Sequence, residues 1–160
     1  MPNSDVQAIL SLGSNVGDSI AQIHTAVHLL QQHGIPSLKS SSHYRTAPWG
    51  NTDQAWFINA CVLVKTHLTP YELLDACLHV EHMMGRKREQ KWAPRVIDID
   101  IITYGEEVHR TQNLTIPHQH ALERAFVLVP LFEICPALQI SGIAIKDALA
   151  HVDVSGILKC

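Results

Sequence analysis

Two acidic side chains, Asp98 and Asp100, interrupt the run Val96–Ile102, which is otherwise apolar. Residues two apart on a strand point to one face, so both carboxylates would project together with Cα atoms about 7 Å apart. Ionised carboxylates are costly beside apolar surface and beside each other, and a divalent cation removes both costs. Mg²⁺ is typically held by one or two carboxylates together with substrate phosphates. The pair therefore predicts a magnesium site, with a solvated edge strand as the alternative.

A cluster of cations directly precedes this acidic pair. Five of the twelve Lys and Arg residues fall within it: Arg86, Lys87, Arg88, Lys91 and Arg95. Guanidinium groups bind phosphate oxygens through paired hydrogen bonds. Metal-binding carboxylates beside such cations are typical of phosphoryl transfer, because the cations neutralise charge on the transferring group. Together the two features favour a phosphoryl-transfer site over a solvated charged run.

The segments that must position these residues alternate between strands and helices. One helix is expected from a capping-box pattern at Ser19 to Gly34, and another from the N-cap Thr69 to Gly85. Apolar or alternating runs predict strands at Ala8–Leu12, Leu38–Tyr44, Phe57–Thr66 and Val96–Tyr104. The order β-α-β-β-α-β predicts a ferredoxin-like α+β sandwich, with an antiparallel sheet, helices on its faces and a C-terminal extension.

Smaller elements are expected in the remaining residues. Val108–Arg110 and Leu114–Ile116 could pair as a hairpin, and Pro117–Leu122 could start a short helix. Ala144–Val152 is expected to form a helix that covers the sheet edge. Gly13–Gly17 is expected to be a tight turn, since it lacks the lysine of a P-loop that would cradle phosphates.

Composition and charge restrict the class of protein. The 160 residues are 46% hydrophobic, which excludes a disordered chain and fits one domain, residues 1–160. The net charge of -3 argues against a general nucleic-acid-binding or anionic-membrane-binding protein, because such proteins need a basic surface. The N-terminus lacks a signal-peptide pattern, and the apolar runs fall short of the roughly 20 residues that span a bilayer. We expect a monomeric, cytoplasmic protein.

A longer signature, Lys91–Ile102, surrounds the acidic pair. Collinear motifs extend over nearly the whole chain: Leu12–Asn15, Tyr44–Pro48, Phe57–Ala60, Gly85–Arg88, Thr115–His118 and Pro130–Ile134. Together they resemble the 6-hydroxymethyl-7,8-dihydropterin pyrophosphokinase family of folate biosynthesis. The resemblance implies that the pterin hydroxymethyl oxygen attacks the β-phosphorus of ATP, which transfers pyrophosphate and releases AMP.

The resemblance also implies a role for individual residues. Asp98 and Asp100 would hold two Mg²⁺ ions with ATP, and Arg86 and Arg95 would join them in catalysis. The pterin pocket would be formed by Thr46, Ala47, Trp49, Phe57, Asn59, Trp92 and Phe126. The ATP site would be formed by Glu81, Arg86, Arg88, Arg95, Ile101, Thr115, His118 and Arg124. A flat heterocycle is suited by aromatic faces and a few directed hydrogen bonds, so the two phenylalanines would sandwich the pterin ring.

Two other classes of function stay open on the sequence. One is an RNA-binding ferredoxin-like module that uses the basic loop, although the strands lack the paired aromatic residues of such a surface. The other is a metal or nucleotide sensor without turnover. Identification of the nucleotide product separates both from the enzyme.

Overall fold

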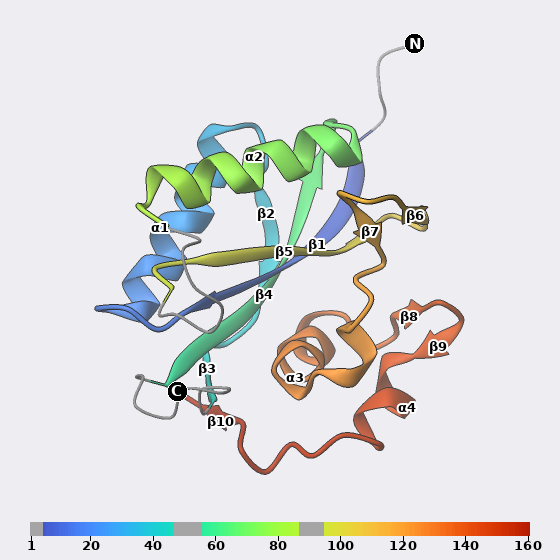
Figure 1. The fold of residues 1–160 in the computed structure, drawn as a ribbon. Coiled ribbons are helices and arrows are strands. Elements are labelled where there is room, and N and C mark those ends of the chain that lie inside the picture. Colours follow the sequence, from blue (N-terminus) through green and yellow to red (C-terminus); the bar gives the residue numbers. More distant parts are fainter. Residues whose placement is uncertain (1–4, 47–55, 87–94) are drawn as a thin grey trace.

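An antiparallel sheet forms the centre of the computed structural model, which describes residues 5–46, 56–86 and 95–160 (Figure 1). The long strand β1 (Val6–Ser14) pairs with β4 (Phe57–Thr66) on one side and β5 (Asp98–Tyr104) on the other. The strand order is β10-β3-β4-β1-β5, where β10 is Leu158–Lys159 and β3 is Tyr44–Thr46. A further strand, β2 (Ser37–Ser40), also pairs with β4. The first strand thus lies between the third and the last strands of the β-α-β-β-α-β unit. This arrangement confirms the predicted fold class.

The predicted strand Leu38–Tyr44 is divided into β2 (Ser37–Ser40) and β3 (Tyr44–Thr46). The division occurs at Ser41, where side chain and backbone both bond to the neighbouring strand. Ser41 Oγ accepts a hydrogen bond from Cys61 N at 2.9 Å, and Ser41 N donates to Cys61 O at 2.9 Å. The prediction of one continuous strand is therefore wrong, because a serine side chain replaces a ladder contact here.

Two helices, α1 (Ser19–Gln32) and α2 (Pro70–Met83), cover one face of the sheet (Figure 1). Their apolar residues pack on Leu10 and Leu12 of β1. The predicted capping box of α2 is confirmed, since Thr69 and Glu72 cap each other's backbone N–H groups. The predicted cap of α1 is wrong by one residue: Asp18, not Ser19, accepts the hydrogen bond from Ala21 N at 3.1 Å.

The opposite face is covered by the C-terminal part of the chain (Figure 1). It comprises the 3₁₀ helix η1 (Ala121–Glu123), α3 (Ala125–Ile134) and α4 (Ile145–Leu149). The short helix expected over Pro117–Leu122 thus begins later in the chain. Helix α4 packs on α3 and η1.

The edge of the sheet beside β3 is covered by a strand. β10 (Leu158–Lys159) pairs with β3 there. The helix predicted over Ala144–Val152 is present in part as α4, but it packs on α3 and η1, so its predicted place at the sheet edge is wrong. Unpaired backbone groups at a sheet edge are satisfied directly by a strand, which a helix cannot do.

Two short hairpins complete the described residues. The predicted one is confirmed as β6 (His109–Arg110) and β7 (Thr115–Ile116), and the other consists of β8 (Gln139–Ile140) and β9 (Ile143–Ala144). Among the described helices, none combines the length and the apolar character needed to cross a bilayer.

Candidate active site

The register of the three central strands arranges polar residues in two rows on the face covered by α3. Gly13 of β1 pairs with Asp98 of β5 on one side and with Asn59 of β4 on the other. In the neighbouring row, Ser11 pairs with Asp100. Paired residues on adjacent strands project to the same face. The sheet therefore brings the two predicted aspartates to the same surface as the predicted pterin ligand Asn59.

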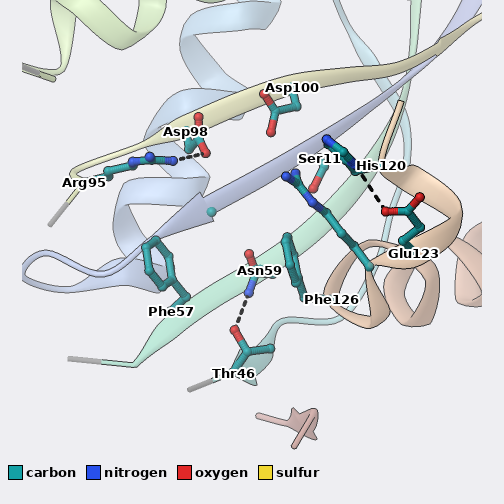
Figure 2. Close-up of a pocket in the computed structure, with 12 residues that line it drawn as sticks. Ser11, Thr46, Phe57, Asn59, Arg95, Asp98, Asp100, His120, Glu123 and Phe126 are labelled. Atoms are coloured by element: carbon teal, nitrogen blue, oxygen red, sulfur yellow. Dashed lines mark hydrogen bonds and ion pairs between the residues drawn. The ribbon is translucent and has the colours of Figure 1, made fainter. Parts of the chain in front are cut away.

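A cavity of about 350 Å³ lies over these rows, between the sheet and the start of α3 (Figure 2). The sheet contributes the floor, and η1 with the N-terminal turn of α3 contributes a wall. The lining residues are Ser11, Gly13, Thr46, Phe57, Asn59, Arg95, Asp98, Asp100, His120, Glu123, Arg124 and Phe126.

Two phenylalanine rings and an amide give one part of this cavity its shape. Figure 2 shows Phe57 projecting from β4 and Phe126 from α3, with Asn59 between them in this view. Asn59 is buried, and its Nδ2 donates a hydrogen bond to Thr46 Oγ1 at 2.9 Å. This bond orients the amide and leaves its oxygen as a fixed acceptor. An aromatic slot with a fixed amide is suited to a flat heterocycle that carries N–H groups.

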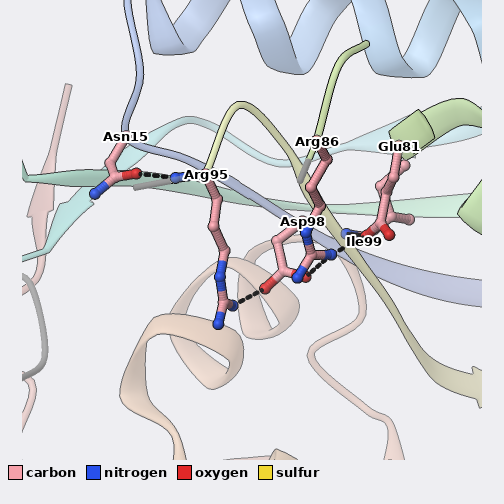
Figure 3. A network of polar contacts seen from close by, with 6 residues as sticks. All are labelled: Asn15, Glu81, Arg86, Arg95, Asp98 and Ile99. Atoms are coloured by element: carbon pink, nitrogen blue, oxygen red, sulfur yellow. Dashed lines mark hydrogen bonds and ion pairs between the residues drawn. The ribbon is translucent and has the colours of Figure 1, made fainter. Parts of the chain in front are cut away.

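Asp98 is held by two arginines at the other part of the cavity (Figure 3). Arg86 Nη1 donates to Asp98 Oδ1 at 2.9 Å, and Arg95 Nη1 donates to Asp98 Oδ2 at 2.9 Å. The Arg95 side chain is 31% exposed and lines the cavity, whereas that of Arg86 is 7% exposed. Arg95 is therefore the guanidinium of this pair that a bound anion reaches more readily.

Glu81, at the end of α2, secures this arrangement from behind. It is 2% exposed, and its Oε2 accepts hydrogen bonds from Arg86 Nη1 at 2.6 Å and from Ile99 N at 2.8 Å. The first contact places Arg86 against Asp98, and the second fixes the backbone between the two aspartates. Glu81 thus acts on the cavity through Arg86 and β5.

Asp100 is a buried carboxylate whose neighbouring arginines do not fully offset the cost of its charge. Burial is the main cause that raises the pKa of Asp100, the charge of Asp98 adds to the rise and Arg124 opposes it, and the resulting pKa is about 7. Near neutral pH, Asp100 is therefore partly protonated. A divalent cation would relieve both burial and repulsion, and the oxygen donors of this pair fit Mg²⁺. The residues present therefore suit the predicted metal.

A second hollow of about 180 Å³ lies at the β5 edge of the sheet. Its lining includes the predicted ATP residues Ile101, Thr115 and His118, and Asp100 lines this hollow as well as the larger cavity. Burial lowers the pKa of His118, and the positive charge of Arg124 lowers it further. The imidazole is therefore largely neutral at pH 7, which suits contact with an uncharged part of a ligand.

Comparison with known proteins shows the family of the chain. Residues 9–136 match the model of a family described as 7,8-dihydro-6-hydroxymethylpterin-pyrophosphokinase (HPPK). The chain belongs to the HPPK family. The resemblance that the sequence motifs predicted is thus confirmed.

Curated HPPK relatives extend over most of the chain. A Methylorubrum extorquens protein named 2-amino-4-hydroxy-6-hydroxymethyldihydropteridine pyrophosphokinase is 51% identical over 152 residues, covering 94% of this chain and 96% of the relative. A Bacillus subtilis protein of the same name is 44% identical over 133 residues, covering 82% and 80% respectively. Among solved structures, Plasmodium falciparum HPPK-DHPS with pterin and p-hydroxybenzoate has a TM-score of 0.75 at 16% identity. That likeness covers 93% of this chain and 44% of the Plasmodium chain, and it shows the fold alone.

The HPPK site residues predicted from sequence occupy three places in the structure. Thr46, Phe57, Asn59, Phe126, Arg95, Asp98, Asp100 and Arg124 line the large cavity, while Ile101, Thr115 and His118 line the second hollow. Glu81 and Arg86 form the buried ion pair behind Asp98. The predictions for Ala47, Trp49, Lys87, Arg88, Lys91 and Trp92 lie outside the described residues.

Four lining residues of the cavity were not predicted from the sequence. Ser11 and Gly13 lie two residues apart on β1, so strand alternation places them on one face. That this face is the one that carries Asn59 follows from the register of β1 and β4. His120 directly precedes η1 and Glu123 is its last residue, and a hydrogen bond of 3.2 Å joins His120 Nδ1 and Glu123 Oε2. No local pattern indicated these two, because their place depends on how the chain crosses back over the sheet.

Proposed function

We propose that this HPPK transfers pyrophosphate from ATP to the hydroxymethyl group of 6-hydroxymethyl-7,8-dihydropterin, and releases AMP, at the cavity over β1, β4 and β5. One observation carries the assignment to this place. The pair Asp98 and Asp100 lies between an aromatic slot with a fixed amide and a second hollow, and Asp100 lines both. Two substrates could thus occupy separate hollows and meet at the acidic pair.

The pterin is assigned to the slot between Phe57 and Phe126. The Asn59 oxygen, oriented by Thr46, is an acceptor for N–H groups at the ring edge. Ala47, Trp49 and Trp92 complete this pocket in the proposal, on the strength of the family resemblance. Both aromatic faces and one fixed amide give a neutral ring a defined orientation.

ATP is assigned to the second hollow, with its phosphates directed toward Asp98 and Asp100. Ile101, Thr115 and His118 would contact the nucleoside. Arg95 and Arg124, which line the large cavity, would contact phosphates, and Arg88 would join them. Both carboxylate contacts of Arg86 use Nη1, and its side chain is 7% exposed, so Arg86 has less access to a phosphate than Arg95 has.

Two Mg²⁺ ions would be held by Asp98 and Asp100. When bound, they supply neutralisation of the negative charge on the phosphates. Asp100 gives up the proton that its raised pKa otherwise retains. Arg95 would free Asp98 Oδ2 for the metal by turning toward the nucleotide, while Asp98 Oδ1 would keep its hydrogen bond from Arg86.

The reaction balances with groups that the substrates supply. The hydroxymethyl oxygen forms a bond to the β-phosphorus, and the bond from that phosphorus to the oxygen bridging it to the α-phosphate breaks. AMP leaves with the bridging oxygen, and the hydroxyl proton passes to solvent. The residues of the chain contribute alignment of the two substrates and neutralisation of charge, which are the main requirements of a loose phosphoryl-transfer transition state.

The proposal extends to organisation and location. Residues 1–160 would act as one domain, supported by the return of β10 to the edge of the same sheet at β3. The protein would act as a cytoplasmic monomer on small molecules, without nucleic-acid or membrane partners. The acidic net charge of -3 supports the latter expectation.

Nucleotide identification tests the function. The protein is incubated with ATP, Mg²⁺ and 6-hydroxymethyl-7,8-dihydropterin, and the nucleotides are separated and quantified. AMP is expected in amounts equal to the pyrophosphorylated pterin, and neither product is expected when the pterin is omitted. ADP as the product would mean ordinary single-phosphoryl transfer, and tight Mg-ATP binding without any AMP would favour the sensor.

A further inference from the structure

Gly13 occupies a position where the backbone does not require glycine. The sequence predicts a tight turn at Gly13–Gly17, but the structure places Gly13 inside β1, paired on both sides. Its φ is not positive, in contrast to that of Gly17 at the turn itself. Glycine within a strand weakens the strand, and often marks a place where another group approaches the backbone closely. The reason for glycine here must therefore be sought above the sheet surface.

The nearest group above Gly13 is the Asn59 amide. A Cβ atom added at Gly13 would lie 2.9 Å from Asn59 Oδ1, which is closer than such contacts occur. The amide cannot simply turn away, because its Nδ2 is bonded to Thr46 Oγ1 at 2.9 Å and Asn59 is 5% exposed. The orientation of the Asn59 oxygen thus depends on the missing side chain at position 13.

Gly13 also leaves an opening between the two parts of the cavity. It lies directly between Asp98 and Asn59 in the cross-strand row, and it lines the cavity with both. Since neighbouring strands are about 4.8 Å apart, the Cα atoms of Asp98 and Asn59 are about 10 Å apart. At the equivalent point of the neighbouring row, β1 carries the Ser11 side chain. The row through Gly13 therefore offers a direct path along the sheet surface.

We infer that the opening over Gly13 admits the hydroxymethyl arm of the pterin, which passes there from the ring slot at Asn59 to the acidic pair. Gly13 is then a positioning residue, whose missing side chain lets the attacking oxygen reach the β-phosphorus. This inference rests on the proposed function. It adds the path by which the two substrates meet and the residue that keeps this path open.

The first test compares Gly13→Ala with Gly156→Ala. Gly156 is a matched control, because a Cβ there meets no atom within 4 Å and its φ is not positive. Gly13→Ala is expected to lower kcat roughly 100-fold, the loss typical of a misplacement of about 1 Å at a reacting centre. The Kd for Mg-ATP should stay close to that of the wild type, the melting temperature should fall because the Cβ atom displaces the Asn59 amide, and Gly156→Ala should change neither quantity. A kcat within about twofold of the wild type in Gly13→Ala would overturn the inference.

A second comparison distinguishes two reasons for glycine at position 13: room for the hydroxymethyl arm, and room for the Asn59 amide. Asn59→Ala removes the oxygen that a Cβ at position 13 would touch. If glycine at position 13 is needed only to leave room for the Asn59 amide, the double variant Gly13→Ala/Asn59→Ala should have the same kcat as Asn59→Ala. We expect a further loss in kcat of roughly tenfold or more, because the methyl group still blocks the arm. No further loss would contradict the path.

A third measurement needs no variant, and so does not depend on the folding of Gly13→Ala. Wild-type protein with Mg²⁺, a non-hydrolysable ATP analogue and the pterin should show NOEs between the hydroxymethyl protons and the Gly13 Hα protons. Saturating pterin without such NOEs would overturn the inference. The proposed function fails separately, and visibly, if the wild type forms no AMP.

Discussion

The two faces of β5 carry opposite kinds of side chain. Ile99 and Ile101 point into the apolar core beneath α1 and α2 and are 5% and 6% exposed. Asp98 and Asp100 point to the other face, where they border a cavity of about 350 Å³. One face is filled and contributes to folding. The other keeps a cavity, a carboxylate with a raised pKa and a strand glycine, each of which costs stability.

Strand alternation places the side chains that stabilise the fold on one face of the sheet and those proposed for the chemistry on the other. Substitutions on the α1/α2 face that lie away from the second hollow should change the free energy of unfolding and leave turnover of the folded protein nearly unchanged. Substitutions on the α3 face should change turnover, and some should even stabilise the fold.

The largest effect is expected at the acidic pair. Asp98→Ala and Asp100→Ala should each lower kcat by more than roughly 1000-fold, because the site loses a metal ligand and charge neutralisation of the phosphates. AMP release measures the turnover, and circular dichroism confirms that both variants stay folded. Nearly normal turnover in both variants would reject the metal-binding role.

A substitution on the α1/α2 face should lower stability and leave kcat nearly unchanged. Leu30 of α1 is 1% exposed, and Leu30→Ala should lower the free energy of unfolding by roughly 2–5 kcal/mol through loss of apolar contact and creation of a cavity. Urea unfolding measures this change. The kcat of the folded protein should stay close to the wild-type value, and a kcat loss like that of the aspartate variants would show that the faces are not separate.

Glu81 connects the two faces, so its removal should affect both properties. Glu81→Gln leaves the buried Arg86 with weaker compensation and should destabilise the protein by roughly 3 kcal/mol. It should also lower kcat, since Arg86 and the Ile99 backbone are no longer held beside Asp98. Asp75→Asn, at an exposed position on the same helix, is the control and should change stability by less than about 0.5 kcal/mol. Equal behaviour of the two variants would contradict the bridging role.

A smaller effect with a defined sign is expected from the pKa of Asp100. In metal-free protein, the folded-state pKa of about 7 lies above the ordinary value of 3.8. The folded state therefore binds more protons between these values, and stability falls as pH rises through this window. Relative to the wild type, Asp100→Asn should gain about 4 kcal/mol of stability at pH 8 and little at pH 4.

Urea unfolding in EDTA at several pH values measures this difference. Subtracting the wild-type curve from that of Asp100→Asn isolates the one carboxylate. A difference that does not depend on pH would mean that the burial of Asp100 carries no cost, and would remove one contrast between the two faces.

Local rules account for the parts of the site that could be predicted from the sequence. Alternation along one strand places Asp98 and Asp100 on a common face whatever the strand pairs with. The Thr69 cap likewise depends on residues within one turn of the helix. The family could be identified because its motifs are continuous in sequence. In each case the determining contacts lie within a few residues of one another.

Non-local contacts account for the parts that could not be predicted. The break between β2 and β3 depends on the hydrogen bonds between Ser41 and Cys61, and the place of β10 depends on pairing with Tyr44 and Arg45. The wall of the cavity near His120 depends on how α3 packs against the sheet. Such pairings join residues far apart in the chain, so no short pattern encodes them.

The amino-acid sequence by itself determined the chemical identity of the site: two carboxylates on one strand face, guanidinium groups beside them and aromatic residues for a ring. The tertiary structure alone decided how these groups are combined. It placed Gly13 between Asp98 and Asn59, put Asp100 on the boundary of two hollows and drew Arg86 into a buried ion pair. The physical reason is that side-chain direction follows from the local backbone, whereas the neighbour that a side chain meets follows from strand register and layer packing.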